Sequence, residues 1–350
     1  MTRVHLAIPI RNVASWLDES LDSLVRQTYT HWTASLVHDA EEEEDDQTRA
    51  LAQAWVERDP RFRLSRPGRV GLVGALNHAM SERGDAEFLA RFDGDDICHP
   101  DRLTRQTSFL RANPEISVVD CRSDSFRSSG DPLPGGMARY QRWHDGIQTH
   151  DDFEREFLVE NPVCHPAAMM RADALELLAE DDSNTLLSSP YRDGDFPEDY
   201  DLWLRLLRGG ARFHKLTDRL LQWRDHDGRT SRVDPSYRSD AFFELKWDHF
   251  QRTHIAPDLR LAVWGGRGHG KQWVRALVGA GSPPIAVVDI NPRSIGSTRQ
   301  GIPVVAPEAL ASLRPDLLIL AVGSEGARTL MEQQAEQAAL RTVAVAGLAG

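Results

Sequence analysis

The sequence contains few cysteines: Cys98, Cys121 and Cys164 are the only three among 350 residues. Their odd number and wide spacing exclude a disulfide framework and a Cys-x-x-Cys pair of metal ligands. Cys98 and Cys164 each precede a histidine, but neighbouring residues rarely bind one ion with good geometry, so no zinc site is expected. This cysteine usage suits a reducing compartment, and we predict a cytoplasmic protein.

Long apolar runs and an excess of basic charge are missing as well. The N-terminal stretch MTRVHLAIPIRN lacks the apolar core of a signal peptide, and no window is long enough to span a membrane. Lysine and arginine total 41 against 53 aspartate and glutamate residues, which gives a net charge of −12. A general nucleic-acid binder needs a basic face, so we expect no nucleic-acid partner and at most a peripheral contact with a membrane.

What the sequence does contain, near its N-terminus, is an alternation of strand-like and helix-like segments. Apolar runs bounded by turn residues predict buried strands, and the amphipathic segments between them predict helices. The predicted strands are residues 4–10, 32–39, 61–65 and 87–92. Such alternation predicts an α/β fold with a largely parallel sheet and helices on both of its faces.

The rest of the chain is more varied. Glycine, proline and polar residues predict a long loop over 128–141, whereas 197–210 predicts a helix and 237–254 an amphipathic linking helix. After that helix the strand–helix alternation restarts and predicts a second, small parallel sheet. The expected parts are a domain over 1–232, a helical linker over 233–256 and a Rossmann-like module over 257–350.

Three aspartates, Asp93, Asp95 and Asp96, lie within four residues directly behind a predicted strand. Ligands of open parallel sheets bind beyond the carboxyl ends of the strands, so Asp93 should face the same crevice as Asp39, which ends another strand. An Asp-x-Asp turn, bent tightly at Gly94, supplies the oxygen ligands that Mg²⁺ and Mn²⁺ prefer, and such a cation neutralises charge on a departing diphosphate. The alternative is an acidic turn without a ligand. An isolated Asp-Gly-Asp-Asp would favour that alternative, but its place at the crevice favours a metal site.

The stretch FLARFDGDDICHPDRLTRQ resembles the Asp-x-Asp segment of the family 2 glycosyltransferases. Further stretches resemble other blocks of that family in the same order, and these are AIPIRN, SLDSLVRQTYTHW, GLVGALNHAM, EDYDLWLRLLRGG and QWRDHDGRTS. The resemblance covers roughly residues 3–232. It implies a GT-A fold and an inverting, metal-dependent enzyme that transfers a hexose from a nucleotide-diphosphate sugar to an acceptor hydroxyl.

The resemblance also implies roles for individual residues. Asp39 would contact the nucleotide base, Asp93 the ribose and the metal region, and Asp95 the metal beside the diphosphate. His226 would complete the metal or diphosphate shell, and Asp199 would be the general base for the acceptor hydroxyl. The remaining donor-binding residues in the matching blocks are Pro9, Asn12 and Asn77.

One departure from the family concerns the nucleotide. The family usually has a second aspartate and a Gly-Ser turn after the base-binding strand, whereas here Asp39 is followed by AEEEEDD. The nucleotide therefore stays open, with UDP favoured and GDP or dTDP as alternatives. The resemblance implies a saccharide or lipid-linked acceptor in the synthesis of a bacterial surface polysaccharide or glycolipid.

Asp199 also has a structural interpretation. An acid in the first turn of a helix stabilises the positive end of the macrodipole and needs no catalytic role. From the residues alone, Glu198 and Asp199 are structural more often than catalytic, and the ordered family blocks favour the base role for Asp199. His165, in NPVCHPAAMM, fits a family position near the acceptor side. Arg91 and Arg102 flank the aspartates and either contact phosphate or balance charge, and charge balance is the favoured interpretation.

The C-terminal module contains VWGGRGHGKQW, which approximates the dinucleotide-binding fingerprint. Gly266 and Gly268 match it, Lys271 occupies its third glycine position, and Asp289 would be the ribose acid. A structural role, the binding of a nucleotide or sugar nucleotide, and NAD-dependent chemistry stay open for this module, in that order. Two other functions thus compete with glycosyl transfer: an NAD-dependent two-domain oxidoreductase and a non-catalytic sugar-nucleotide-binding protein.

Overall fold

The computed structural model describes residues 3–41, 44–178, 189–324 and 326–346. The chain divides into two compact units, one formed by residues 1–153 with 162–245 and the other by residues 154–161 with 246–350. Within the described ranges, no helix combines the length and the apolar character that crossing a bilayer requires. The predicted domain boundaries at residues 232 and 257, and the roles assigned to the parts that they separate, stay predictions.

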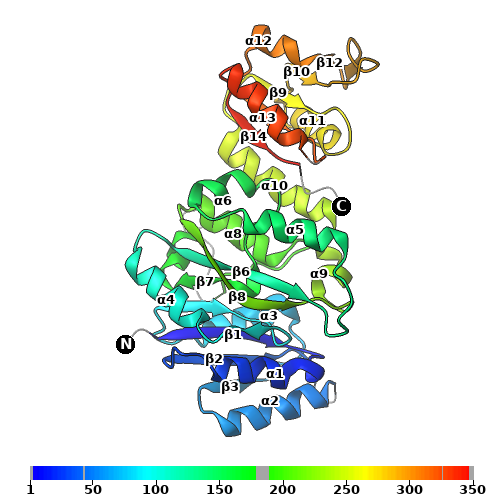
Figure 1. The fold of residues 1–350 in the computed structure, drawn as a ribbon. Coiled ribbons are helices and arrows are strands. Elements are labelled where there is room, and N and C mark those ends of the chain that lie inside the picture. Colours follow the sequence, from blue (N-terminus) through cyan, green and yellow to red (C-terminus); the bar gives the residue numbers. More distant parts are fainter. Residues whose placement is uncertain (1–2, 42–43, 179–188, 325, 347–350) are drawn as a thin grey trace. The chain divides into compact units, whose positions relative to one another are not determined.

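An eight-stranded sheet organises the larger unit, in the order β3-β2-β1-β4-β7-β6-β8-β5 (Figure 1). Its strands are β1 (Val4–Ile10), β2 (Trp32–His38), β3 (Phe62–Ser65), β4 (Phe88–Arg91), β5 (Ile97–Cys98), β6 (Val118–Phe126), β7 (Met169–Arg171) and β8 (Phe213–Arg224). The first four strands pair in parallel, β7 is antiparallel to β4 and β6, and β5 is antiparallel to β8. The α/β class is confirmed, but the sheet is mixed rather than largely parallel. β5 and β7 have only two and three residues, too few to leave a hydrophobic pattern.

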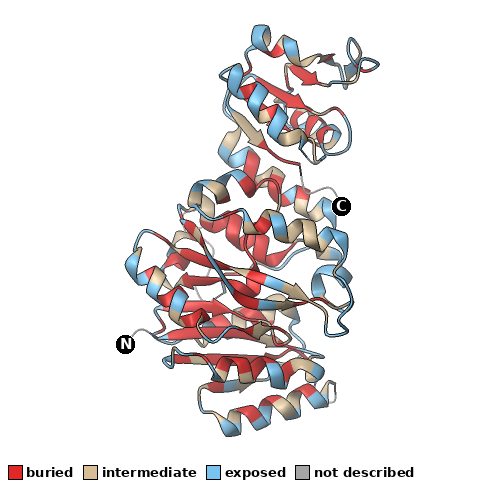
Figure 2. Ribbon diagram, viewed as in Figure 1, coloured by how far each residue is buried: buried red, intermediate tan, exposed pale blue. Residues whose placement is uncertain are grey.

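Several helices of this unit bury an apolar stripe. In α1, for example, Leu17, Leu21 and Leu24 are buried at helical spacing. Figure 1 shows α1 and α2 side by side at the β1–β2–β3 end of the sheet. In Figure 2 most strand residues of this sheet are buried, whereas the helices keep exposed outer faces. The helical elements are α1 (Ala14–Val25), α2 (Asp46–Arg58), α3 (Gly71–Ser81), α4 (Arg102–Ala112), α5 (Gly135–Asp145), α6 (His150–Glu156), α8 (Glu198–Arg208), α9 (Thr230–Val233) and α10 (Ser239–His254), with short 3-10 turns η1 (His165–Ala167), η2 (Asp173–Leu177) and η3 (Pro235–Tyr237). Two of these helices, α6 and α10, continue into the residues assigned to the smaller unit.

The predicted loop over 128–141 is wrong in its second half, where α5 begins. The helix could not be predicted from the sequence at its start, because Pro134 is the N-cap and two glycines form the first turn. With such weak local propensity, α5 depends on tertiary anchors at its other end. One of them is the contact between His144 Nε2 and Asp120 Oδ2 at 3.1 Å.

The smaller unit contains a second sheet in the order β11-β12-β10-β9-β13-β14. Its elements are β9 (Leu261–Trp264), α11 (His269–Gly279), β10 (Ala286–Val288), β11 (Thr298–Arg299), β12 (Ile302–Val305), η4 (Pro307–Ala309), α12 (Leu310–Leu313), β13 (Leu317–Leu320), α13 (Ala327–Gln337) and β14 (Thr342–Ala344). All described strand pairs in it are parallel except β11 with β12. The predicted second parallel sheet is therefore confirmed.

Close backbone contacts shape the glycine-rich turn between β9 and α11. A Cβ on Gly270 would lie 1.6 Å from Gly265 O, and Gly265 itself has a φ of +118° with Ala321 O 2.9 Å from its Cβ position. Gly265 and Gly270, which the fingerprint did not single out, therefore tolerate no side chain. Nucleotide binding by this turn stays a prediction.

Candidate functional site

The acidic turn begins where β4 leaves the sheet. β1 and β4 pair as far as Ala7 and Arg91, after which the Phe92 N–H donates to Ala7 O at 3.3 Å. The next parallel bond would need an N–H from Pro9, which has none, and Phe92 O accepts from Arg91 Nη1 instead. Pro9 thus ends the pairing and frees the chain to turn at Asp93. Contact of Pro9 with a donor stays a prediction.

The carboxylates of the turn converge: Asp93, Asp95 and Asp96 each offer an oxygen within 4.8 Å of the others. Asp93 Oδ1 accepts from Arg91 Nη2 at 2.6 Å, and Asp95 Oδ2 contacts His226 Nε2 at 2.8 Å. The three residues predicted to bind the metal, Asp93, Asp95 and His226, thus lie in one cluster. His226 belongs to it through its contact with Asp95.

Asp96, to which the sequence assigned no role, is the most deeply buried member of this cluster, with 1% of its surface exposed. Its Oδ1 accepts from the Arg224 N–H at 2.8 Å, while its Oδ2 is buried without a hydrogen-bond partner. Burial, and then the charges of Asp95 and Asp93, raise the pKa of Asp96 well above its usual value. A buried, unpaired carboxylate oxygen beside two further carboxylates fits the oxygen-only ligand set of Mg²⁺ or Mn²⁺.

Arg224, at the end of β8, braces the turn from behind. Its Nε donates to Asp95 O at 2.6 Å and its Nη2 to Glu19 Oε2 at 2.7 Å, in addition to its backbone bond to Asp96. The sequence pointed to an Arg-x-His segment but gave a role only to His226. The bracing was missed because 128 residues separate Arg224 from Asp96 along the chain.

Gly94 lies between the aspartates and packs against the end of β1. A Cβ there would lie 3.0 Å from Ile10 Cγ2 and 3.4 Å from Val13 Cγ2. Gly94 does not have a positive φ, so the expected tight bend does not explain why a glycine occupies this position. The explanation is that a side chain would have too little room there.

We expect Gly94→Ala to lower the free energy of unfolding by about 1–3 kcal/mol, the usual cost of overpacking. It should also weaken Mn²⁺ binding, because the methyl group displaces the turn that carries Asp93 and Asp95. Urea denaturation and Mn²⁺ titration measure the two effects. Gly136→Ala in α5 is the control, since nothing lies within 4 Å of its Cβ position. A Gly94→Ala protein as stable as wild type, with unchanged Mn²⁺ affinity, would contradict this account.

Asp39 follows β2 and is 6% exposed. Its Oδ1 accepts from the N–H groups of Val70 and Gly71 at 2.7 and 2.8 Å, at the start of α3. Its Oδ2 lies 4.0 Å from Arg11 Nη1. One carboxylate oxygen therefore holds α3, and the other is the one through which the predicted contact with the base would be made.

Asn12 and Asn77, the remaining predicted donor residues, are bonded within the protein. The N–H of Asn12, which has a φ of 54°, donates to Asp45 Oδ2 at 2.5 Å. Asp45, which belongs to the acidic run that departs from the family pattern, therefore lies against the residues that follow β1. Asn77 Nδ2 donates to Tyr191 O at 2.9 Å, and Asn77 Oδ1 accepts from the Tyr191 N–H at 3.0 Å. Contact of either asparagine with a donor stays a prediction.

Asp199 lies in the first turn of α8, 7% exposed, and its Oδ1 accepts from the Tyr200 N–H at 2.7 Å. Beside it, Glu198 Oε2 accepts from the Tyr237 hydroxyl at 2.8 Å. Burial raises the pKa of Tyr237 well above its usual value, and the charges of Asp199, Glu198 and Asp93 add to the shift. The charges of the predicted base and of the acidic turn thus both act on the Tyr237 hydroxyl, and their cooperation in one site stays a prediction.

His165 lies near Glu198. Its Nε2 contacts the Tyr191 hydroxyl at 2.9 Å, and its Nδ1 lies 3.8 Å from Glu198 Oε1. Burial, and then the charge of Arg91, lower the pKa of His165 well below its usual value, so the ring is neutral near neutral pH. Arg91, for which charge balance was favoured over contact with phosphate, donates to Asp93 Oδ1, and its charge acts on Glu198 and Tyr191. The larger unit thus contains a carboxylate cluster that could offer oxygen ligands to a cation and the buried carboxylate pair Glu198 and Asp199.

The model of glycosyl transferase family 2 matches residues 6–178. EpsE of Bacillus subtilis (strain 168) is 29% identical over 248 residues, which cover 68% of this chain and 78% of that protein. The amylovoran biosynthesis glycosyltransferase AmsE of Erwinia amylovora is 27% identical over 208 residues, covering 59% of this chain and 70% of AmsE.

Solved structures with a similar fold include TarS from S. aureus in complex with UDP-GlcNAc, with a TM-score of 0.52, 15% identity, and coverage of 73% of this chain and 68% of that one. The mannosyltransferase PcManGT from Pyrobaculum calidifontis, in complex with GDP-Man and Mn²⁺, has a TM-score of 0.51 and 18% identity. It covers 73% of this chain and 66% of its own. The expected GT-A fold is confirmed by these likenesses.

Proposed function

The chain belongs to glycosyl transferase family 2 through residues 6–178, and on that premise we propose that its larger unit carries out a metal-dependent hexosyl transfer. Family 2 enzymes invert the anomeric configuration of the sugar that they transfer, and this chain is such a glycosyltransferase. The oxidoreductase alternative has no support among its relatives. What we propose beyond the family is the metal, the donor and the residues that act.

One observation supports the proposal most directly. Three carboxylates at the end of β4 converge within 4.8 Å, and Asp96 Oδ2 among them is buried without a partner. Three neighbouring negative charges are costly unless a cation or a proton offsets them. We propose that Asp93 and Asp95 hold Mg²⁺ or Mn²⁺, that Asp96 Oδ2 faces the same ion, and that His226 orients Asp95. When bound, the cation would neutralise the charge that develops on the leaving diphosphate.

We propose that the donor is a nucleotide-diphosphate hexose. TarS and PcManGT were solved with UDP-GlcNAc and with GDP-Man plus Mn²⁺, so both nucleotides are candidates, with UDP favoured. AmsE belongs to amylovoran biosynthesis, which supports an acceptor in the synthesis of a surface polysaccharide or glycolipid. A cytoplasmic location with at most a peripheral contact with a membrane completes the proposal, and fractionation of cells tests it.

The proposed reaction is a single displacement. Asp199, ionised and held by the Tyr200 N–H, takes the proton of the acceptor hydroxyl as that oxygen bonds to the anomeric carbon. The bond from the anomeric carbon to the diphosphate oxygen breaks at the same time, and the nucleoside diphosphate leaves with the electron pair. Attack from the face opposite the nucleotide inverts the configuration.

A melting-temperature screen tests the donor and the metal together. UDP-GlcNAc, GDP-mannose and the free nucleoside diphosphates are each added with Mn²⁺ or with EDTA. The matching donor should stabilise the protein only with Mn²⁺, by about 2.7 kcal/mol at a hundredfold excess over its Kd. Stabilisation by NAD⁺ instead, or by no nucleotide sugar at all, would contradict the proposal. Donor binding without release of nucleoside diphosphate would indicate the non-catalytic binding protein.

A further inference from the structure

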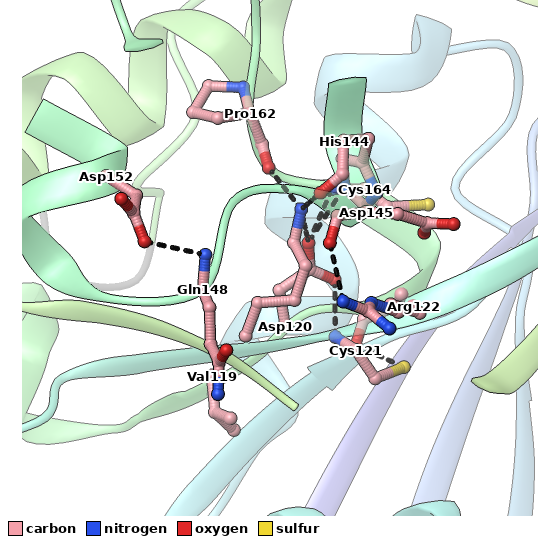
Figure 3. A network of polar contacts seen from close by, with 12 residues as sticks. Val119, Asp120, Cys121, Arg122, His144, Asp145, Gln148, Asp152, Pro162 and Cys164 are labelled. Carbon is pink, nitrogen blue, oxygen red and sulfur yellow. Dashed lines mark hydrogen bonds and ion pairs between the residues drawn. The ribbon is translucent and has the colours of Figure 1, made fainter. Parts of the chain in front are cut away.

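A second cluster of charged side chains is buried in the larger unit, and the reaction described above does not use it. Asp120 on β6, His144 at the end of α5 and Lys215 on β8 are each only 1% exposed. Figure 3 shows Asp120 and His144 together with Pro162 and Cys164, which come from the segment between α6 and η1. We call Asp120, His144 and Lys215 the buried clamp.

The clamp holds backbone groups of that segment. Lys215 Nζ donates to His144 O and to Pro162 O, both at 3.0 Å, and lies 3.4 Å from Asp120 Oδ2. The same Asp120 oxygen accepts from the Cys164 N–H and contacts His144 Nε2, both at 3.1 Å. Pro162 and Cys164 are therefore fixed by one cation and one anion that are themselves bonded to each other.

Stability alone does not explain the clamp. Burying an ion costs several kcal/mol even after relaxation, and apolar side chains of similar volume are often as stabilising as a buried ion pair. Burial lowers the pKa of Lys215 to about 8, and the attraction of Asp120 only partly offsets this. What an apolar replacement could not do is bond the carbonyl of Pro162 and the N–H of Cys164. The clamp specifies a backbone conformation.

The residue that this conformation presents is His165, directly after Cys164. Its ring contacts the Tyr191 hydroxyl at 2.9 Å, lies 3.8 Å from Glu198, and packs edge-on against Trp203 of α8. Glu198 is the neighbour of Asp199 in the first turn of α8. A continuous series of contacts therefore leads from the clamp through His165 to the helix turn that carries the proposed base.

We propose that Asp120 and Lys215 are positioning residues for glycosyl transfer: they fix the backbone from Pro162 to Cys164, so that His165 holds the first turn of α8 at the acceptor side. This inference rests on the proposed function for its catalytic consequence. Its structural part, that the clamp immobilises the segment, stands independently of that function and is measured separately.

The charge-neutral double variant Asp120→Asn/Lys215→Met separates positioning from folding. It removes both buried charges together, so no unpaired ion is left, but Pro162 O loses its donor. The protein should stay folded, and Cys164, which is buried in the wild type, should become reactive to iodoacetamide, as read by mass spectrometry of its peptide. Turnover of UDP-GlcNAc or GDP-mannose with Mn²⁺ should fall at least about tenfold, a misplacement effect, while donor-induced stabilisation stays unchanged.

Two further variants extend the test, and His165→Asn, which leaves the clamp intact, keeps the test possible if the double variant does not fold. Asp120→Asn/Lys215→Gln also leaves no unpaired ion but retains an N–H donor, so it should keep more of the turnover and of the Cys164 protection than the double variant with Lys215→Met. His165→Asn should reproduce the loss of turnover with Cys164 still protected, and adding it to the clamp variant should cause little further loss, because the two changes act on one path. Glu82→Gln, a carboxylate outside the site that bonds Ser65 at 2.6 Å, is the control and should change neither measurement.

The outcomes distinguish the two levels of the proposal. Normal turnover in a variant with a reactive Cys164 would overturn the positioning role and leave the proposed function intact. Continued protection of Cys164 in the double variant would overturn the clamp itself. A wild-type protein that binds no nucleotide sugar would overturn the proposed function and the positioning role with it, although the alkylation result would still show whether the clamp holds the segment.

Discussion

Asp95→Asn should lower the release of nucleoside diphosphate from the matching donor by about 10²–10³-fold, the usual loss when one electrostatic contact to a developing charge is removed. The amide keeps the shape of the side chain and can still bond His226, which now lies 2.8 Å from Asp95 Oδ2. It has no negative charge with which to hold a divalent cation. Stabilisation by the donor should therefore no longer depend on Mn²⁺.

The same variant should fold normally. Without a cation, Asp95 is repelled by Asp93 and Asp96, which lie within 4.8 Å of it, so removing one charge relieves strain in the free protein. Asp227→Asn is the matched control, because its side chain is 94% exposed and belongs to the segment that carries His226. Equal losses in both variants would indicate a general electrostatic effect and not a metal site, and an Asp95→Asn enzyme of normal Mn²⁺-dependent activity would exclude Asp95 as a ligand.

Asp199→Asn should lower turnover by about 10²–10⁴-fold, the range for removal of a general base. Its amide oxygen can still accept from the Tyr200 N–H, as Asp199 Oδ1 does at 2.7 Å, so the first turn of α8 should keep its geometry. In contrast to Asp95→Asn, this variant should bind the donor and Mn²⁺ with unchanged affinity. Single-turnover release of nucleoside diphosphate, measured beside donor-induced stabilisation, separates the two steps.

The structural alternative for Asp199 is that it only stabilises the helix dipole. Asp173→Asn tests that alternative directly, because Asp173 is an exposed acid in the first turn of η2 and lies outside the site. Both substitutions remove a first-turn carboxylate, but only Asp199→Asn should reduce turnover. If Asp199→Asn lowers the melting temperature and leaves turnover per folded molecule unchanged, Asp199 is structural and the base must be sought elsewhere, with Glu198 as the nearest carboxylate.

The parts of the site that could be predicted from the sequence are local. Asp93 and Asp95 directly follow an apolar strand, and the rule that ligands bind at strand ends places them without knowledge of any distant contact. The partners of these aspartates could not be found in this way. Arg224 reaches Asp96 across 128 residues, and no period or spacing in the sequence relates the two. Asp96 itself was visible but indistinguishable from a turn residue until its buried, unpaired oxygen was seen.

The sequence by itself determined the alternation of strands and helices over residues 4–92 and in the C-terminal module, and it determined the acidic turn. Apolar periodicity and turn chemistry act over a few neighbouring residues, which is why these features can be predicted. Only the tertiary structure decided that the sheet of the larger unit is mixed, that α5 replaces half of a predicted loop, and that Asp120 and Lys215 form a buried ion pair. The physical reason is the same in each case. Short strands, helices of low propensity and buried ion pairs depend on groups that are far away in the chain. Their own sequence segments therefore contain no pattern from which they could be predicted.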